Sequence, residues 1–285
     1  MTSSRIRMWL SNPWARPRFL WILALGYVVW TLVPVGIAVL FSFNSGRSIA
    51  TWQGFSLRWY CCDVSSVWRD AELRATFVNT LRLGVLTVLI SVPLGVAFAL
   101  AVDRWRSKAS QGLNFLMLFA FVTPEIAIGI ALFLFFIHLV TFIHLGLPAQ
   151  LLGLSMFEMA YVVIIVRARL LSLGKEFEEA AMDLGASPTQ ALRLVTLPLL
   201  APAIFASAAI VLAVTIDDFV IAQQLNLDAS TQTIPIKIYG AARSGPLPSL
   251  NALASIALTL STLLVGIAFL AYRQASRSTR QAKVA

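Results

Sequence analysis

Six long apolar stretches occupy most of the chain and decide what it can fold into. Each reaches the length of about 20 residues that an α-helix needs to cross the hydrocarbon core of a bilayer. The stretches are Phe19–Phe43, Phe77–Val102, Leu113–Val140, Leu151–Leu171, Leu197–Ala222 and Ala252–Tyr272. Alternation of apolar and polar residues, the pattern of a membrane β-barrel strand, is absent. The sequence therefore predicts an all-α polytopic membrane protein with six transmembrane helices.

Composition supports a single membrane domain. Hydrophobic residues make up 59% of the 285 residues and charged residues only 12%, against about 45–50% and about 25% in soluble domains. These proportions argue against an ordinary cytosolic enzyme and a disordered chain. We expect a transmembrane domain over residues 19–272, a cytoplasmic segment 1–18 and a cytoplasmic tail 273–285. The first stretch is too long for the apolar core of a signal peptide, so it is expected to remain as a helix.

The distribution of basic residues predicts the orientation. The net charge is +9, which in a soluble protein would point to nucleic acid. In a membrane protein, Lys and Arg collect in the cytoplasmic loops instead. The two end segments and the segments after the second and fourth stretches together hold 15 Lys and Arg, against six in the alternate segments. We therefore expect both termini in the cytoplasm and no nucleic-acid partner.

The segment between the fourth and fifth stretches departs from this rule. Residues 172–187 carry one base, Lys175, against four acids, whereas every other cytoplasmic segment is basic. Good helix formers over Lys175–Leu184 and the following Gly185 predict a short helix with a C-terminal glycine. A second helix is predicted to begin directly afterwards. Ser187 suits its N-cap, Pro188 its first position, and Gln190 completes a capping box.

The first of these short helices has two different faces. At helical spacing, Glu176, Glu179 and Asp183 share one face, and Phe177, Ala180, Ala181 and Leu184 share another. One interpretation is an amphipathic loop that lies on the lipid surface. Because anionic cytoplasmic lipid repels an acidic helix, a protein partner with a basic or apolar groove is favoured.

The same segment resembles a known motif. Glu179-Ala180-Ala181, Gly185, Val195, Leu197 and Pro198 resemble the EAA motif, E-A-A-x3-G-x9-I-x-L-P, of ABC importer membrane subunits, with Val195 in place of Ile. In that family the loop forms a coupling helix that inserts into a groove of the ATPase subunit. The resemblance implies coupling helices over about residues 172–197. It implies coupling residues Glu178, Glu179, Ala180, Ala181, Asp183 and Gly185.

Further segments over roughly residues 20–272 resemble the spermidine/putrescine importer permeases of the C type. They include residues 123–126, 166–170, 178–186, 195–204, 217–221 and 251–253. The resemblance implies a MetI-like permease fold in a bacterial inner membrane and a non-catalytic subunit without a cofactor of its own. It also implies four kinds of partner: a pair of ATPase subunits that bind ATP and Mg, a second related permease, an outer substrate-binding protein and a polyamine substrate.

Three departures from this family fall on the outer side. Residues 156–159 read Met-Phe-Glu-Met where the family often has a His, residues 225–228 lack the usual glycines, and Ser249-Leu250 replaces Glu-Ile. Since substrate is received on that side, a permease for another small solute, such as an anion or an amino acid, is the alternative within the same class.

Acidic residues within the apolar stretches favour a cation. Such groups cost about 2.5–3.5 kcal/mol each on insertion scales and usually face protein or water. Glu125 follows Pro124 in the third stretch, Glu158 lies in the fourth, and Asp217 and Asp218 end the fifth. Carboxylates would replace water around each ammonium of a di- or polyamine, and aromatic faces would add cation–π attraction. These four residues are the predicted substrate path.

Each of these acids also has a structural interpretation. The two aspartates would pair with Lys237 or Arg243 at a helix end, Glu125 would be a buried hydrogen-bonded acid, and Glu158 would be a surface residue. Because neighbouring residues point about 100° apart on a helix, we expect only one aspartate to face the path.

Other chemistries have no motif in the chain. It has no G-x4-G-K-[ST] loop for ATP and no G-x-S-x-G, H-E-x-x-H or C-x-x-C pattern. We therefore predict no catalytic residue and no metal site, and expect His138 and His144 to lie at the outer edge. The adjacent Cys61 and Cys62 are interpreted as two half-buried residues rather than a vicinal disulfide. A stand-alone channel or secondary transporter is the rival class, but it leaves the acidic segment unexplained.

Overall fold

The computed structural model describes residues 18–48, 50–105, 108–244 and 248–282. Most of these residues are helical, and an isolated bridge between Asn44 and Phe55 is the only β pairing among them. Residues 1–17 of the predicted N-terminal segment and 283–285 of the predicted tail lie outside the described ranges.

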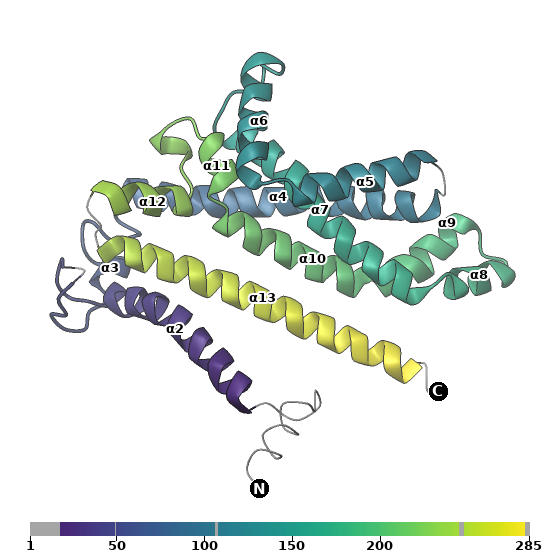
Figure 1. Ribbon diagram of the computed structural model, residues 1–285, viewed down its shortest axis with the longest axis horizontal. Helices are drawn as coiled ribbons and strands as arrows, with labels where there is room; N and C mark the ends of the chain where they lie inside the picture. Colours follow the sequence, from purple (N-terminus) through teal and green to yellow (C-terminus); the bar gives the residue numbers. More distant parts are fainter. Residues whose placement is uncertain (1–17, 49, 106–107, 245–247, 283–285) are drawn as a thin grey trace, which may run out of the picture.

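Five helices in this part of the chain are long and apolar enough to cross a membrane. They are α2 (Arg18–Ser42), α4 (Ala71–Arg104), α7 (Leu147–Leu173), α10 (Leu197–Asp217) and α13 (Pro248–Ala282). Figure 1 shows α4, α7, α10 and α13 running along the length of the molecule, with α2 beside α13 at one edge. Five of the six predicted spans and the all-α membrane fold class are thus confirmed.

The third predicted span is not one continuous helix. The chain forms α5 (Lys108–Val122) and α6 (Glu125–His138), and α6 stands across the direction of the long helices (Figure 1). Pro124 explains the break, because it lacks an N–H for a helical hydrogen bond. Its backbone is extended, and its carbonyl accepts hydrogen bonds from the amides of Ala127 and Ile128 in the new helix. The prediction of an unbroken helix over Leu113–Val140 is wrong.

The core lies where α4, α7 and α10 meet. Its buried side chains are aliphatic and come from all three helices, with one from α5: Val92, Ala99, Met117, Ala160, Val162, Val163, Val166, Leu200 and Val211. By contrast, α2 exposes its apolar side chains along most of its length. Exposed apolar surface of this kind suits lipid or another membrane helix.

Short helices cluster at one end of the molecule (Figure 1). They are α3 (Arg58–Cys61), α11 (Val220–Gln224), the 3₁₀ turn η2 (Ala229–Thr231) and α12 (Ile234–Ser244). The last three of these lie between α10 and α13. Trp59 and Val67 pack with Ile234, Leu250 and Leu253, which joins the segment between α2 and α4 to α12 and the start of α13 in one apolar cluster.

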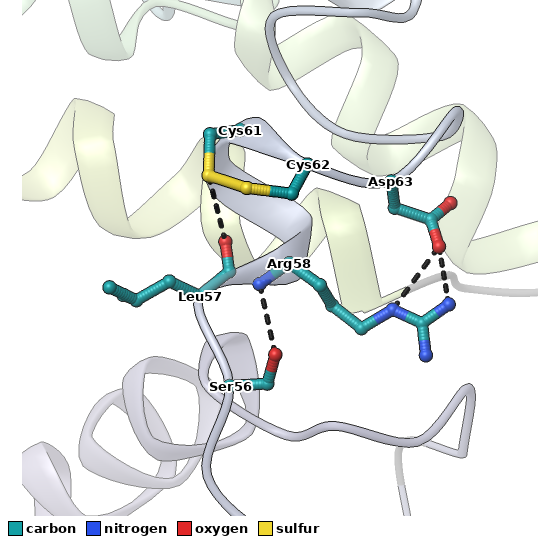
Figure 2. Close-up of a disulfide and its surroundings, with 6 residues drawn as sticks. All are labelled: Ser56, Leu57, Arg58, Cys61, Cys62 and Asp63. Atoms are coloured by element: carbon teal, nitrogen blue, oxygen red, sulfur yellow. Dashed lines mark hydrogen bonds and ion pairs between the residues drawn. A yellow bond between two sulfur atoms is a disulfide. The ribbon is translucent and has the colours of Figure 1, made fainter.

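Cys61 and Cys62 form a disulfide at the end of α3 (Figure 2). Both residues are exposed, so the interpretation as two half-buried residues is wrong. Beside them, the guanidinium of Arg58 binds the carboxylate of Asp63, and this hydrogen bond lowers the pKa of Asp63. The disulfide and the ion pair together fix the turn that leaves α3.

The opposite end of the molecule holds a projecting segment, residues 174–196, which we call the elbow. It contains α8 (Glu176–Asp183), α9 (Pro188–Ala191) and the π-helical turn η1 (Leu192–Thr196), which leads directly into α10. Figure 1 shows α8 and α9 beyond the ends of the long helices.

Candidate functional site: an acidic cavity and the elbow

The elbow has the local structure that its sequence predicts. The helix α8 begins one residue after Lys175 and ends before Gly185, which has a φ of +90°. Only glycine adopts this conformation without strain, so the turn requires it. The side chain of Ser187 accepts a hydrogen bond from the amide of Gln190, and Gln190 bonds back to the amide of Ser187. The predicted capping box is therefore confirmed.

The elbow exposes acidic and apolar side chains together. Glu176, Glu179 and Asp183 are exposed on α8. Leu184, at the tip between the two helices, is 91% exposed, and Phe177 and Met182 are also exposed. No residue of α8 is buried. An exposed apolar tip flanked by carboxylates is a surface that suits a protein partner with an apolar pocket and basic rim.

Glu178 differs from the other acids of α8. One guanidinium nitrogen of Arg104, the last residue of α4, donates hydrogen bonds to the two carboxylate oxygens of Glu178 at 2.6 and 2.8 Å. Thr196, at the end of η1, donates its hydroxyl to the same carboxylate at 3.0 Å. Among the predicted coupling residues, Glu178 is thus bonded through its side chain both to the end of α4 and to η1.

At the other end, three of the four predicted substrate-path acids line one cavity. Glu125, Asp217 and Asp218 contribute to the wall of a cavity of about 880 Å³, together with apolar residues of α10, α12 and α13. Glu125 is the first residue of α6 and is half-buried. A helix N-terminus favours a carboxylate, because the backbone amides there carry a partial positive charge.

Both aspartates reach this cavity, contrary to the expectation that only one would. The helix α10 ends at Asp217, and Asp218 is extended, so the helical angle between neighbours does not apply. Asp218 is 9% exposed and accepts a hydrogen bond at 2.9 Å from the amide of Ala222, in the first turn of α11. Asp217 is exposed.

The alternative ion pairs for these aspartates do not form. Lys237 binds Glu72, and Arg243 binds the hydroxyl of Tyr239. Within the described ranges, the carboxylate of Asp217 accepts no hydrogen bond and forms no ion pair, and its side chain is exposed, which leaves it available to a ligand.

Glu158 lies neither in the wall of this cavity nor on the surface. It is not among the residues that line the cavity, and it is 0% exposed. Thr215 of α10 lies 2.6 Å from one of its carboxyl oxygens, and the other oxygen has no partner among the described residues. The surface interpretation of Glu158 is therefore wrong.

Two aromatic rings beside the acids were missed by the sequence analysis. Phe219 and Tyr239 both line the cavity, with ring centroids 4.6 Å apart, and the guanidinium of Arg243 lies 4.7 Å from the Tyr239 ring centre. The spacing of Tyr239 and Arg243, four residues apart on a helix, was the available clue. The Tyr239 ring thus already makes a cation–π contact with a side chain of its own helix.

Metal ligands do not gather in this region. Within the ranges that the structure describes, no three His, Cys, Asp or Glu side chains are placed to hold a metal ion. The ring nitrogen Nδ1 of His138 lies 3.1 Å from the carbonyl of Leu134 one turn earlier in α6. The cavity is thus acidic and aromatic, and it can hold an organic cation.

Comparison with known protein families and sequences gives consistent matches. Residues 91–280 match the family described as "Binding-protein-dependent transport system inner membrane component". The chain is 32% identical over 268 residues to the putrescine transport system permease protein PotI of Escherichia coli K12, covering 91% of both chains. It is 32% identical over 233 residues to the spermidine/putrescine permease protein PotC of the same organism, covering 82% of this chain and 86% of that protein.

Solved structures share the fold. A bacterial ABC transporter that imports the acidic polysaccharide alginate matches with a TM-score of 0.67 at 17% identity, over 94% of this chain and 99% of that one. The methionine ABC transporter MetNI matches with a TM-score of 0.57 at 19% identity, over 71% and 93%. The predicted MetI-like permease fold is therefore confirmed. Because one of these proteins moves an acidic polysaccharide, the fold alone does not decide the charge of the substrate.

Proposed function

The chain belongs to the family of binding-protein-dependent transport system inner membrane components, and we propose that it forms, with a second related permease, the pore of an ATP-driven importer of di- and polyamines. It is the membrane-spanning subunit and not an enzyme by itself. The ATP and Mg that drive the cycle bind to a pair of partner ATPase subunits. A substrate-binding protein delivers the amine to the end that carries α12, and both termini lie in the cytoplasm.

The acidic cavity carries the substrate assignment. Putrescine and spermidine are flexible chains with a positive ammonium at each end. Glu125, Asp217 and Asp218 provide carboxylates around one space, and Phe219 and Tyr239 provide aromatic faces in the same wall. Charge-assisted hydrogen bonds to carboxylates and cation–π contacts would together replace the water that an ammonium loses on entering. Sequence similarity to PotI and PotC supports the same substrate class.

The elbow carries the proposed link to ATP. Its exposed acids and the apolar tip at Leu184 dock in a groove of the ATPase subunit, with Glu179, Ala180, Ala181, Asp183 and Gly185 as the coupling residues. When ATP binding brings the two ATPase subunits together, the groove displaces the elbow. Since α7 leads into the elbow and α10 leads out of it, both helices follow, and α10 carries Asp217 at its far end. The cavity thereby changes access from one side of the membrane to the other.

A transport assay separates this proposal from its alternatives. The complete importer, with its ATPase subunits and binding protein, is reconstituted in proteoliposomes and supplied with labelled putrescine, spermidine, an amino acid or sulfate. We expect uptake of both amines that requires ATP, and no uptake of sulfate. ATP-dependent uptake of sulfate or the amino acid without the amines would reject the amine assignment. Uptake by this chain alone without ATP would instead favour a stand-alone channel.

A further inference from the structure

Three segments that are distant in the sequence meet at the carboxylate of Glu178. Arg104 comes from the end of α4, Glu178 from the first half of α8, and Thr196 from the turn that precedes α10. We call these three residues the Glu178 junction. The family resemblance of the sequence implies that Glu178 is a coupling residue. Nothing in the sequence predicts a contact between α4 and the elbow.

The rest of α8 has little that fixes its position against the membrane helices. None of its residues is buried. It lies between two glycines with positive φ, Gly174 at +71° and Gly185 at +90°. A cavity of about 420 Å³ separates it from the ends of α4 and α7, and Leu170, Leu173 and Phe177 are among the residues that line it. A helix held in this way depends on polar contacts for its orientation.

The contacts of Glu178 suit that role. Both carboxylate oxygens are used: one guanidinium nitrogen bridges them at 2.6 and 2.8 Å, and the Thr196 hydroxyl adds a bond at 3.0 Å. Thr196 is 9% exposed, so one of the two partners of Glu178 is held firmly by its surroundings. The side chains of Arg104 and Glu178 remain 36% and 23% exposed. An ion pair at that exposure adds little stability, so its effect lies in the geometry that it imposes.

We propose that Glu178 is a positioning residue that ties the elbow to α4 as well as to the start of α10, so that α4 moves together with the elbow during transport. This inference rests on the proposed docking of the elbow to an ATPase subunit. Without the junction, displacement of the elbow reaches α4 only indirectly, through its packing against α7 and α10 in the core. With the junction, the end of α4 is also linked directly to the elbow.

The test compares two Glu→Gln substitutions, each of which removes the charge of one ion pair. Glu178→Gln acts at the junction, and Glu72→Gln acts on the pair between Glu72 and Lys237 at the other end of α4. The measured quantities in the reconstituted importer are the amount of ATPase subunit that co-purifies and the ATP hydrolysed per amine imported. We expect both variants to keep the ATPase subunits, and Glu178→Gln alone to raise the ATP cost per amine about fivefold, since it weakens charge-assisted hydrogen bonds. Arg104→Glu combined with Glu178→Arg should restore the ratio that each single change disturbs.

Two results would overturn the inference. Loss of the ATPase subunits from Glu178→Gln would assign Glu178 to the docking surface. An ATP cost for Glu178→Gln equal to that for Glu72→Gln would show that the junction transmits nothing.

A distance measurement separates failure of the junction from failure of the proposed function. Spin labels at Ala101→Cys on α4 and Met182→Cys on α8, with Cys61 and Cys62 replaced by serine, report their separation without any substrate. We expect one narrow distance distribution with and without ATP, and a broad one in Glu178→Gln. A distribution equally narrow in both proteins contradicts the junction, whether or not the importer moves amines.

Discussion

The two neighbouring carboxylates Asp217 and Asp218 have different hydrogen-bonding environments because α10 ends at the first and α11 begins shortly after the second. Asp217 closes α10 and its side chain is exposed to the cavity, whereas its neighbour Asp218 accepts a hydrogen bond in the first turn of α11. Both face the place where an ammonium would bind, but only Asp218 has a structural hydrogen bond to keep.

Replacing these aspartates by asparagine tests their role in transport. Asp217→Asn and Asp218→Asn each remove one negative charge, and asparagine still offers an oxygen to the amide of Ala222. We expect each to raise the KM for putrescine and spermidine uptake about tenfold, the effect of losing one charge-assisted hydrogen bond. Asp228→Asn is the control, because Asp228 caps η2 away from the cavity. An unchanged KM in both cavity variants would leave these residues a structural role only.

The sequence predicts which residues carry charge into the membrane region, but not how each is oriented. Glu125, Asp217 and Asp218 were recognised from their residue type within apolar stretches, and they do share a cavity. Glu158 is also an acid within an apolar stretch, but it is fully buried. Its partner Thr215 lies on α10, 57 positions further along the sequence. Glu178 likewise turns inward because Arg104, 74 positions away, is there to receive it. Long-range partners of this kind are not visible in local spacing.

At the scale of helices, termini were predicted well and breaks less well. The capping box at Ser187 and the glycine at 185 depend on residues within one turn of each other, so their sequence pattern determines them. Pro124 lies inside the third predicted span, and the sequence predicts that this span continues through it. Whether a proline kinks a helix or ends it depends on what packs around it. Here the chain turns at Pro124. In the new helix α6, Phe136 packs against residues of α4, α7 and α11, and Gly129 lies against α11.

The capping box offers a test at this scale. Ser187→Ala removes the oxygen that accepts the Gln190 amide, which should destabilise the start of α9 by about 1 kcal/mol. Amide exchange over residues 187–192, followed by mass spectrometry, should then become roughly fivefold faster. The matched variant Ser172→Ala removes a hydroxyl that bonds to the carbonyl of Arg169 at the end of α7 and should leave this exchange unchanged. Equal exchange in Ser187→Ala and the parent protein would mean that the cap does not hold α9.

At the scale of the whole molecule, three surfaces of the described chain are open to a neighbour or a ligand. At one end the acidic cavity opens between α10, α12 and α13, and at the other the elbow projects with exposed acids and an exposed apolar tip. Along one edge, α2 is exposed over most of its length. Each surface matches one expected neighbour: substrate at the cavity, an ATPase subunit at the elbow, and lipid or the second permease along α2. The family match is consistent with a subunit that works only in such an assembly.

The central claim is that the elbow is the part of this chain that an ATPase subunit binds, and cross-linking tests it most directly. A photoreactive residue is placed at Leu184, which is 91% exposed at the tip of the elbow, and a second at Leu227 on an exposed loop at the opposite end. In cells that make the complete importer, we predict that the Leu184 probe forms a covalent adduct with the ATPase subunit and the Leu227 probe does not. Adducts from Leu184 with lipid alone, or none at all in actively transporting cells, would contradict the account.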